Sequence, residues 1–204
     1  VTLSDKQKID TITVRNEGAE PVSMQLEVSS WSKEEGEDVF SPTRELIVNP
    51  PIFTVPAGGS QLIRVGLRGN SDTQHELTYR VFLQELPNPA SSDFNGAKML
   101  MRISLPVFVL PKIVAKPVLR WRAIRTSDGG LKISITNDGN AHIQIINFSL
   151  SQPGEAQPWI IQKYSDYVLI GQSFDWILPA NSDYSIPQSG ATIQLLAQTD
   201  FGDI

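Results

Sequence analysis

The sequence IDTITVRNEGAEPVSMQLEV at residues 9–28 decides the fold, because it contains two alternating segments with a polar turn between them. In the second segment every second residue is apolar, at Val22, Met24, Leu26 and Val28. This is the period of a β-strand that buries one face. The Asn-Glu-Gly at residues 16–18 is typical of a tight turn. The stretch therefore predicts two strands joined by a short connection.

The same arrangement returns in LKISITNDGNAHIQIINFSL at residues 131–150, with an Asn-Asp-Gly turn between two alternating segments. No segment of the chain has the apolar period of an amphipathic helix. Short strands separated by Pro, Gly, Asn and Asp are typical of β-sandwiches. The repeat therefore predicts an all-β protein made of two sandwiches of related design. Further strands are expected at residues 61–67, 77–86, 98–110, 167–170, 173–178 and 191–198.

The length of 204 residues leaves room for two immunoglobulin-sized domains, since domains commonly have about 100–150 residues. The stretch PKIVAKPVLRW at residues 111–121 is rich in proline and is typical of a stiff, extended linker. We expect the boundary between Pro111 and Pro117. Residues 1–111 are assigned to an N-terminal domain and residues 112–204 to a C-terminal domain.

The composition argues against several classes of function. Cysteine is absent, which excludes structural disulfides, thiolate metal sites and cysteine nucleophiles. A net charge of −5 argues against nucleic-acid binding, which needs a basic face. The two histidines, His75 and His142, lie in different predicted domains, and the acidic residues 34–38 are interpreted as a solvated turn rather than a calcium loop. We therefore expect no enzyme, no metal, no cofactor and no small-molecule substrate.

The segment KMLMRISLPVFVL at residues 98–110 contains a proline, Pro106, inside a strand pattern. A proline cannot donate to a β-ladder and is tolerated mainly at a sheet edge, so the segment is predicted to be an edge strand. One face carries four apolar residues at two-residue spacing: Met99, Met101, Ile103 and Leu105. The alternative is that these four fill the domain's own core. On the opposite face, Leu100, Phe108 and Leu110 are the candidates for that core.

Six ordered segments carry a resemblance to a known family: TVRNEGAEPV (13–22), NPPIFTVPAGGSQLIRVGL (49–67), ELTYRVFLQELP (76–87), RISLPVFVLP (102–111), LKISITNDGNAHI (131–143) and TDFGD (199–203). They resemble the periplasmic chaperones that assemble pili in the chaperone-usher pathway, and RISLPVFVLP is similar to the archaic branch. The resemblance covers essentially the whole chain. It implies two immunoglobulin-like sandwiches set at an angle around a subunit-binding cleft, in a protein of the periplasm.

The resemblance also implies a mechanism. Such a chaperone binds, folds and caps pilus subunits by donor-strand complementation and delivers them to an outer-membrane usher. A pilus subunit lacks the last strand of its own sandwich, and a free edge strand with apolar side chains replaces it. The donor residues are expected to be Met99, Met101, Ile103 and Leu105.

The family grips the subunit's terminal carboxylate with a lysine and an arginine. The lysine falls at Pro106 here, and the arginine falls immediately before Val1, outside this sequence. Arg80 and Lys112 are the candidate replacements. The alternative for Arg80 is a solvated position on the sheet face.

An interdomain salt bridge is a further feature of the family. Its two carboxylates match Glu76 and Asp200, and the arginine between them is replaced by Leu110. Lys112 or Lys116 would then supply the cation, or the bridge is absent.

The alternative function is a two-domain adhesion or carbohydrate-binding sandwich. Its sugar-stacking residues would be sought among the four tryptophans, Trp31, Trp121, Trp159 and Trp176. These residues form no aromatic row along a strand, which favours the chaperone.

Overall fold

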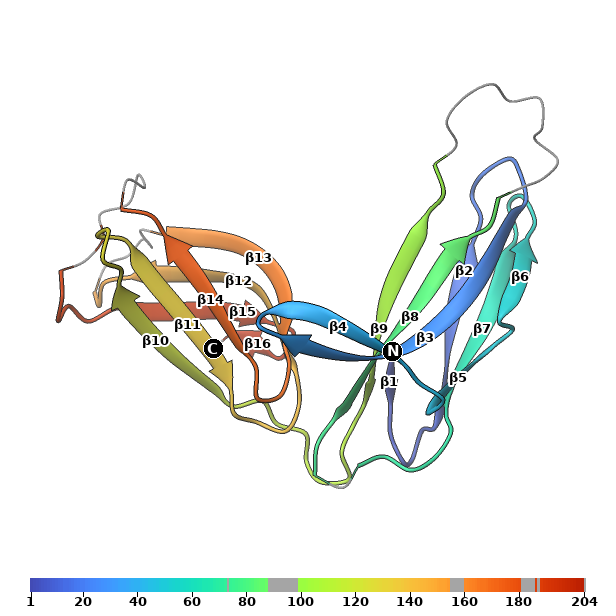
Figure 1. Cartoon of the computed structure of the whole chain (residues 1–204), viewed down its shortest axis with the longest axis horizontal. Coiled ribbons are helices and arrows are strands. Elements are labelled where there is room, and N and C mark those ends of the chain that lie inside the picture. The colour runs from blue at the N-terminus through green and yellow to red at the C-terminus, as the bar shows by residue number, and fades with distance from the viewer. Residues whose placement is uncertain (73, 88–98, 155–159, 181–185, 187, 204) are drawn as a thin grey trace. The chain divides into compact units, whose positions relative to one another are not determined.

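The computed structural model is all-β and divides into two compact units, Val1–Val114 and Ala115–Ile204 (Figure 1). The division falls within the proline-rich stretch of residues 111–117. The structure describes residues 1–72, 74–87, 99–154, 160–180, 186 and 188–203, with the backbone alone at residues 160–164. In this part of the chain, no helix has the length and apolar character needed to cross a membrane.

Unit 1 is a sandwich of two sheets. The larger sheet has the order β1-β9-β8-β3-β4, with β6 also paired to β3, and the smaller sheet has the order β2-β7-β5. The strands are β1 (Thr2–Leu3), β2 (Ile9–Arg15), β3 (Val22–Glu34), β4 (Glu37–Pro42), β5 (Leu46–Asn49), β6 (Ile52–Val55), β7 (Ser60–Leu67), β8 (Leu77–Glu85) and β9 (Arg102–Val109).

The core of unit 1 lies between the two sheets. Alternate residues of β8 point into it, and Tyr79, Val81 and Leu83 are all at most 1% exposed. The Tyr79 hydroxyl donates a hydrogen bond of 2.7 Å to Glu45 Oε2. Burial, and then this hydrogen bond, raise the pKa of Tyr79 above its ordinary value. The hydroxyl group of this core tyrosine therefore has a partner.

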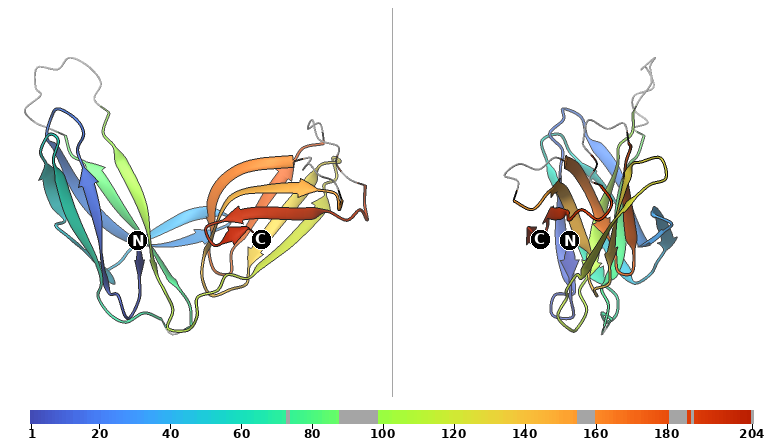
Figure 2. Two further views of the ribbon diagram at one scale, coloured as in Figure 1. Left: turned by 180° about the vertical axis from the view of Figure 1, so that it is seen from behind. Right: turned by 90° about the vertical axis from the view of Figure 1, so that its left-hand side faces the viewer.

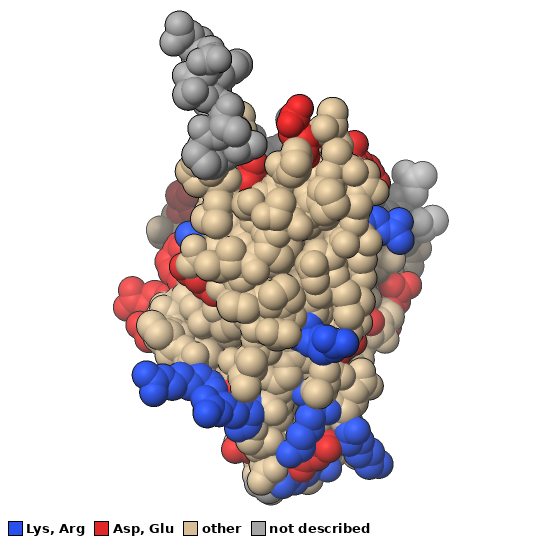
Figure 3. Space-filling view, turned by 90° about the vertical axis from the view of Figure 1, so that its right-hand side faces the viewer, with Lys and Arg blue, Asp and Glu red and all other residues tan. Residues whose placement is uncertain are grey.

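The outer face of the smaller sheet in unit 1 carries exposed apolar side chains. Ile9 and Ile47 flank Gly66 in register across β2, β7 and β5, and they are 61% and 49% exposed. Figure 3 shows the side of unit 1 on which β5, β6 and β7 lie in Figure 1. Neither acidic nor basic residues cover most of this side, and Lys and Arg gather toward its lower end.

Unit 2 is also built from two sheets, with the orders β10-β11-β14 and β13-β12-β15-β16. Two buried clusters lie in this unit, one around Phe148 and Leu150 and one around Ile135 and Ile145. The strands are β10 (Leu119–Arg125), β11 (Leu131–Asn137), β12 (Ile143–Ser151), β13 (Ile160–Val168), β14 (Ser173–Leu178), β15 (Gln194–Thr199) and β16 (Gly202–Asp203).

The two repeated stretches of sequence form the same kind of turn, once in each unit. Asn16 follows β2, and its Oδ1 accepts a hydrogen bond of 3.0 Å from the Gly18 N–H. Asn137 ends β11, and its Oδ1 accepts a hydrogen bond of 3.0 Å from the Gly139 N–H. Each side-chain amide then donates to the carbonyl four residues later, of Glu20 in one unit and of Ala141 in the other. A nearly buried Asn fixes both turns, because its side chain takes the place of backbone partners.

Six strands of the structure were not predicted from the sequence, namely β1, β4, β5, β6, β10 and β16, and β10 begins at Leu119 within the predicted linker. β4 pairs with β3 through a hairpin whose turn residues Glu35 and Gly36 have φ values of 52° and 88°. Within the acidic residues 34–38, Glu35 and Gly36 form this tight turn, whereas Glu34 ends β3 and Glu37 and Asp38 begin β4. The strand predicted at residues 167–170 is the end of β13, which stops at Val168.

Candidate functional site

Strand β9 lies at the margin of the larger sheet of unit 1 (Figures 1 and 2). On one side β8 pairs with its whole length, from Arg102 opposite Gln84 to Val109 opposite Leu77. On the other side β1 pairs with only its last two residues, Phe108 and Val109. Among the residues that the structure describes, no strand pairs with Arg102–Leu105 on the side away from β8. This half of β9 has an open margin.

The hydrogen bonds of β9 show which backbone groups face this margin. The N–H of Phe108 donates to the Val1 carbonyl at 3.0 Å, and the N–H of Leu110 donates to the Leu3 carbonyl at 2.9 Å. Even-numbered residues of β9 therefore direct their backbone groups away from β8. By the same alternation, the N–H and C=O groups of Arg102 and Ser104 face the open margin.

Pro106 belongs to this even-numbered set. Its missing N–H would have faced away from β8, so the ladder between β8 and β9 loses no bond. The Pro106 carbonyl accepts a hydrogen bond of 3.2 Å from the Val1 amino group. This explains how a proline fits inside the strand.

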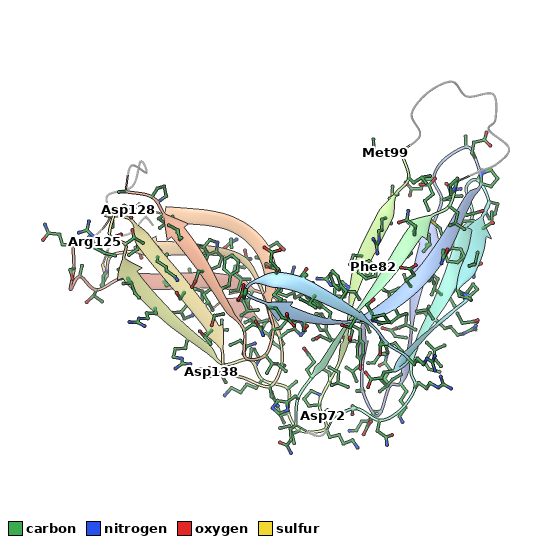
Figure 4. All side chains as sticks on the ribbon, viewed as in Figure 1. Asp72, Phe82, Met99, Arg125, Asp128 and Asp138 are labelled. Carbon is green, nitrogen blue, oxygen red and sulfur yellow. The ribbon has the colours of Figure 1, made fainter. Side chains whose placement is uncertain are left out.

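The exposure of the predicted donor residues falls along the chain. Met99 is 93% exposed and lies on the segment before β9 (Figure 4), and Met101 is 58% exposed. Ile103 and Leu105 are half-buried and pack against the core of unit 1. Met101 and Ile103 also line a groove of about 250 Å³, together with Val14, Val22, Met24, Val55 and Glu85 among others.

The expected core face of β9 was wrong. Val107 and Val109 enter the core and are fully buried, so the core face is the one that also carries Ile103 and Leu105. Phe108 lies on the opposite face, where its ring packs against Trp31 with 6.2 Å between centroids. Leu100 is 36% exposed, and Leu110 is half-buried. Both faces of the chain at residues 107–110 are apolar, so the alternation alone cannot tell which face points into the core.

Arg80 lies on β8 directly opposite Pro106, on the face of the sheet that points away from the core. Its Cζ atom is 3.8 Å from the centroid of the Trp31 ring, which is a cation–π contact. Trp31 is 2% exposed, and its Nε1 donates a hydrogen bond of 2.9 Å to Asp38 Oδ1. Stacking on a buried ring fixes the guanidinium beside residue 106.

A second cation–π contact lies on the same outer face. The Arg102 Cζ atom is 4.6 Å from the centroid of the Phe82 ring, and Phe40 meets Phe82 edge-on with 5.1 Å between centroids. Lys33 is 8% exposed, and its Nζ lies 3.5 Å from Asp38 Oδ1. The outer face of the sheet is therefore aromatic and carries three cations. Of these three cations only Arg80 was predicted from the sequence, because the residues come together from three different strands.

Lys112 follows β9 and has a partner inside unit 1. Its Nζ lies 3.1 Å from Asp5 Oδ2. Asp5 also accepts a hydrogen bond of 3.0 Å from the Ser71 N–H. The backbone and side chain of Ser71, and then Lys112, lower the pKa of Asp5 to about 2. Both candidate anchors, Arg80 and Lys112, therefore already have side-chain contacts within unit 1.

The two carboxylates of the predicted interdomain bridge lie in different units. Glu76 is 5% exposed in unit 1. In unit 2, Asp200 accepts a hydrogen bond of 2.8 Å from the Gln144 N–H, and its Oδ2 lies 3.5 Å from His142 Nε2. The interdomain bridge stays a prediction.

The remaining candidates are the histidines and the tryptophans. The His75 side chain is 63% exposed and lies 4.0 Å from Asp72. No cluster of three or more His, Cys, Asp or Glu that could hold a metal occurs in the described residues. Trp121 and Trp176 pack against the cores of unit 2, and Trp159 lies outside the described residues.

Comparisons with solved structures support the fold. A chaperone–tip adhesion subunit pre-assembly complex from archaic Csu pili of Acinetobacter baumannii matches with 21% identity, a TM-score of 0.70 and coverage of 98% of this chain and 90% of that chain. The E. coli chaperone DraB matches with 20% identity, a TM-score of 0.62 and coverage of 99% and 89%. The Pseudomonas aeruginosa CupB2 chaperone matches with 15% identity, a TM-score of 0.63 and coverage of 99% and 92%. These matches confirm the predicted two-domain all-β fold.

A family model also matches the sequence, whereas a search of curated proteins gave no match. The model describes a pili and flagellar-assembly chaperone, the PapD N-terminal domain, and it matches residues 1–115. This range is more than half of the chain and includes all of unit 1 with β9 and Arg80. The chain therefore belongs to the family of pili and flagellar-assembly chaperones, as the sequence predicted, and it is a chaperone rather than an enzyme.

Proposed function

We propose that this chaperone works in the periplasm, where it binds pilus subunits, completes their unfinished sandwich with the segment from Met99 to Leu105, and delivers them to an outer-membrane usher. The A. baumannii relative is solved in complex with a tip adhesion subunit, which supports a partner of this kind. The observation that carries the proposal is the open margin of Arg102–Leu105. A partner strand can form backbone hydrogen bonds there and extend the sheet.

Most of the free energy gained by burying apolar side chains in the subunit comes from the two methionines, Met99 and Met101. Burial of one large apolar side chain contributes roughly 1.5–3 kcal/mol. Ile103 and Leu105 have already gained part of this in the free protein, because they pack against the core of unit 1. Met99 and Met101 are largely exposed and gain most when a partner covers them. Their unbranched thioethers adapt to pockets of different shape, which suits a chaperone with several subunits.

Arg80 is the proposed anchor for the subunit's terminal carboxylate. A guanidinium offers two parallel N–H donors to a carboxylate, and stacking on Trp31 holds it in one orientation. The anchor would fix the register of the bound strand, and a shift by one residue would turn every apolar side chain to the wrong face. Lys112 is the second candidate, but a subunit would have to compete with Asp5 for it.

Co-expression with pilus subunits in a bacterial periplasm tests the donor segment. Met101→Asp should abolish co-purification of the subunit, because it places a charge where an apolar side chain must enter. Ser104→Asp is the matched control, since it adds the same charge to the opposite, exposed face of the same strand. Equal recovery of subunit with Met101→Asp and with the unmodified chaperone would refute the proposal.

The anchor is tested with two forms of the same subunit, one with its natural C-terminus and one extended by several residues. Arg80→Ala should weaken capture of the natural form by about 1.5–3 kcal/mol, the value of hydrogen bonds to a charged group. The extended form should bind the variant and the unmodified chaperone equally. A similar loss with both forms would show that Arg80 supports the fold instead.

A further inference from the structure

The sulfur atoms of this protein are few and unequally exposed. The chain has no cysteine and three methionines. Met24 is 4% exposed within the core of unit 1, whereas Met99 and Met101 are 93% and 58% exposed. Both accessible sulfur atoms therefore lie in the proposed donor segment, and the third is an internal reference for the same chemistry.

We infer that Met99 and Met101 form an oxidative modification site through which two-electron oxidants such as hypochlorous acid inactivate the free chaperone. The inference rests on the proposed function of this segment. In the reaction the thioether sulfur takes up the oxygen of HOCl and is oxidised to a sulfoxide. The chlorine is reduced to chloride and one proton is released. No cysteine competes for the oxidant, and susceptibility follows exposure.

Strand donation requires an apolar side chain, and oxidation makes the methionine side chain polar. A sulfoxide carries a strong hydrogen-bond acceptor, and a subunit core has no donor placed to meet it. The backbone at Met101 is held in position, because its N–H donates to Glu85 Oε2 at 3.1 Å and its carbonyl accepts from the Glu85 N–H at 2.8 Å. Another residue of the segment therefore cannot take the place of Met101 in the subunit unless the pairing of this segment with β8 shifts its register.

The modification should act on the free chaperone only. In the complex the subunit would cover Met101 and exclude the oxidant from its sulfur. Sulfoxide formation at Met99 and Met101 is reversible by methionine sulfoxide reductases, so the effect is a switch rather than permanent damage. Met24 is protected in both states, and the fold of unit 1 stays intact.

The experiment treats the purified full chain with limited hypochlorous acid and maps the oxygen gain on each methionine by peptide mass spectrometry. Capture of a subunit that co-purifies with the untreated chain is then measured. Oxygen should appear at Met99 and Met101 before Met24, and capture should fall on the order of tenfold or more, because an unpaired polar group enters an apolar site. Treatment with methionine sulfoxide reductase should restore it.

The double variant with Met99→Leu and Met101→Leu is the control, since leucine keeps the apolar volume and cannot be oxidised. Its capture of subunit after treatment should equal its own capture before treatment, whatever level the two leucines give. Equal loss of capture by this variant, unchanged capture by the oxidised natural chain, or oxidation of Met24 at the same rate would each overturn the inference. Failure of the untreated chain to capture any subunit would instead refute the proposed function, and it is seen before oxidant is added.

Discussion

Strands β3 and β9 belong to the same sheet and carry the same alternation of apolar residues, yet their neighbours differ. β8 pairs with β3 on one side, and β6 and β4 pair with it on the other. β9 has β8 along one side and only the two residues of β1 along the other. Met24 on β3 is consequently 4% exposed, while Met101 just before β9 is 58% exposed.

The comparison separates two properties of a strand. Alternation determines that one face is apolar, and the neighbouring strands determine whether the backbone of that strand is available to a partner. β3 has used both its face and its edges in its own fold. β9 has used one edge, and its apolar face from Ile103 to Val109 packs partly or fully against the core, which leaves Met99 and Met101 exposed before the strand. Of these two strands, β9 is the one that retains a free edge, with exposed apolar side chains just before it, so a partner strand can pair with β9 but not with β3.

The largest expected difference between the two strands follows from the same substitution at both methionines. Met24→Asp buries a charge in the core and should lower the free energy of unfolding by more than about 4 kcal/mol. Met101→Asp changes an exposed residue and should alter it by less than about 0.5 kcal/mol. Urea denaturation followed by tryptophan fluorescence measures both. A loss of stability with Met101→Asp as large as that with Met24→Asp would place Met101 in the core.

Proline substitutions test the two sides of β9. The Ile103 N–H faces β8, so Ile103→Pro should destabilise unit 1 by about 1–3 kcal/mol more than Ile103→Ala, which removes the side chain alone. Ser104→Pro removes an N–H that faces the open margin and should be nearly neutral. Chemical denaturation of the three variants gives the comparison. If Ser104→Pro is the most damaging of them, the margin is paired in solution.

Hydrogen exchange examines the same margin without a substitution. The amide of Ser104 should exchange at least about tenfold faster than the amides of Ile103 and Leu105, which lie in the ladder with β8. Exchange of Ser104 should become slow when a subunit is bound. NMR measurement in the free and bound states would show both effects, and equal protection of all three amides in the free protein would contradict the assignment.

The smallest effect concerns the covered end of β9, where Asp5 meets Ser71 and Lys112. The pKa of Asp5 in the folded protein is about 2, below the ordinary value of 3.8. A lowered pKa means that Asp5 stabilises the fold at pH values above about 4 and that this stabilisation disappears as the pH falls toward about 2. Asp5→Asn should flatten the loss of stability in this window, as measured by thermal unfolding at several pH values. Asp72, Asp128 and Asp175 also have lowered pKa values, so part of the acid sensitivity should remain.

Much of the fold was predictable because local signals agree with it. The alternation at Val22–Val28 and the Asn turns at residues 16 and 137 each define structure within a few residues, and the structure contains both. The proline at residue 106 indicated an edge, and it is tolerated because its missing N–H would have faced away from β8. These predictions needed only the geometry of one strand and one turn.

The rest depends on contacts between residues far apart in the sequence. The inner face of β9 could not be chosen, because Val107 and Phe108 are both apolar and only the position of the second sheet separates them. The stacking of Arg80 on Trp31 requires the pairing of β8 with β3. The pairing of Lys112 with Asp5 likewise joins two loops that no local pattern connects.

Pro106 also limits how firmly a guest can be held. A strand that pairs along the free half of β9 meets backbone donors at Arg102 and Ser104 and then a residue that has none to offer. The shared ladder is therefore short. Each of its hydrogen bonds contributes only about 1 kcal/mol in water, so few bonds have to break before the bound strand dissociates. A chaperone that must release its bound subunit benefits from this arrangement, because strand pairing that ends at a proline can be broken from that end.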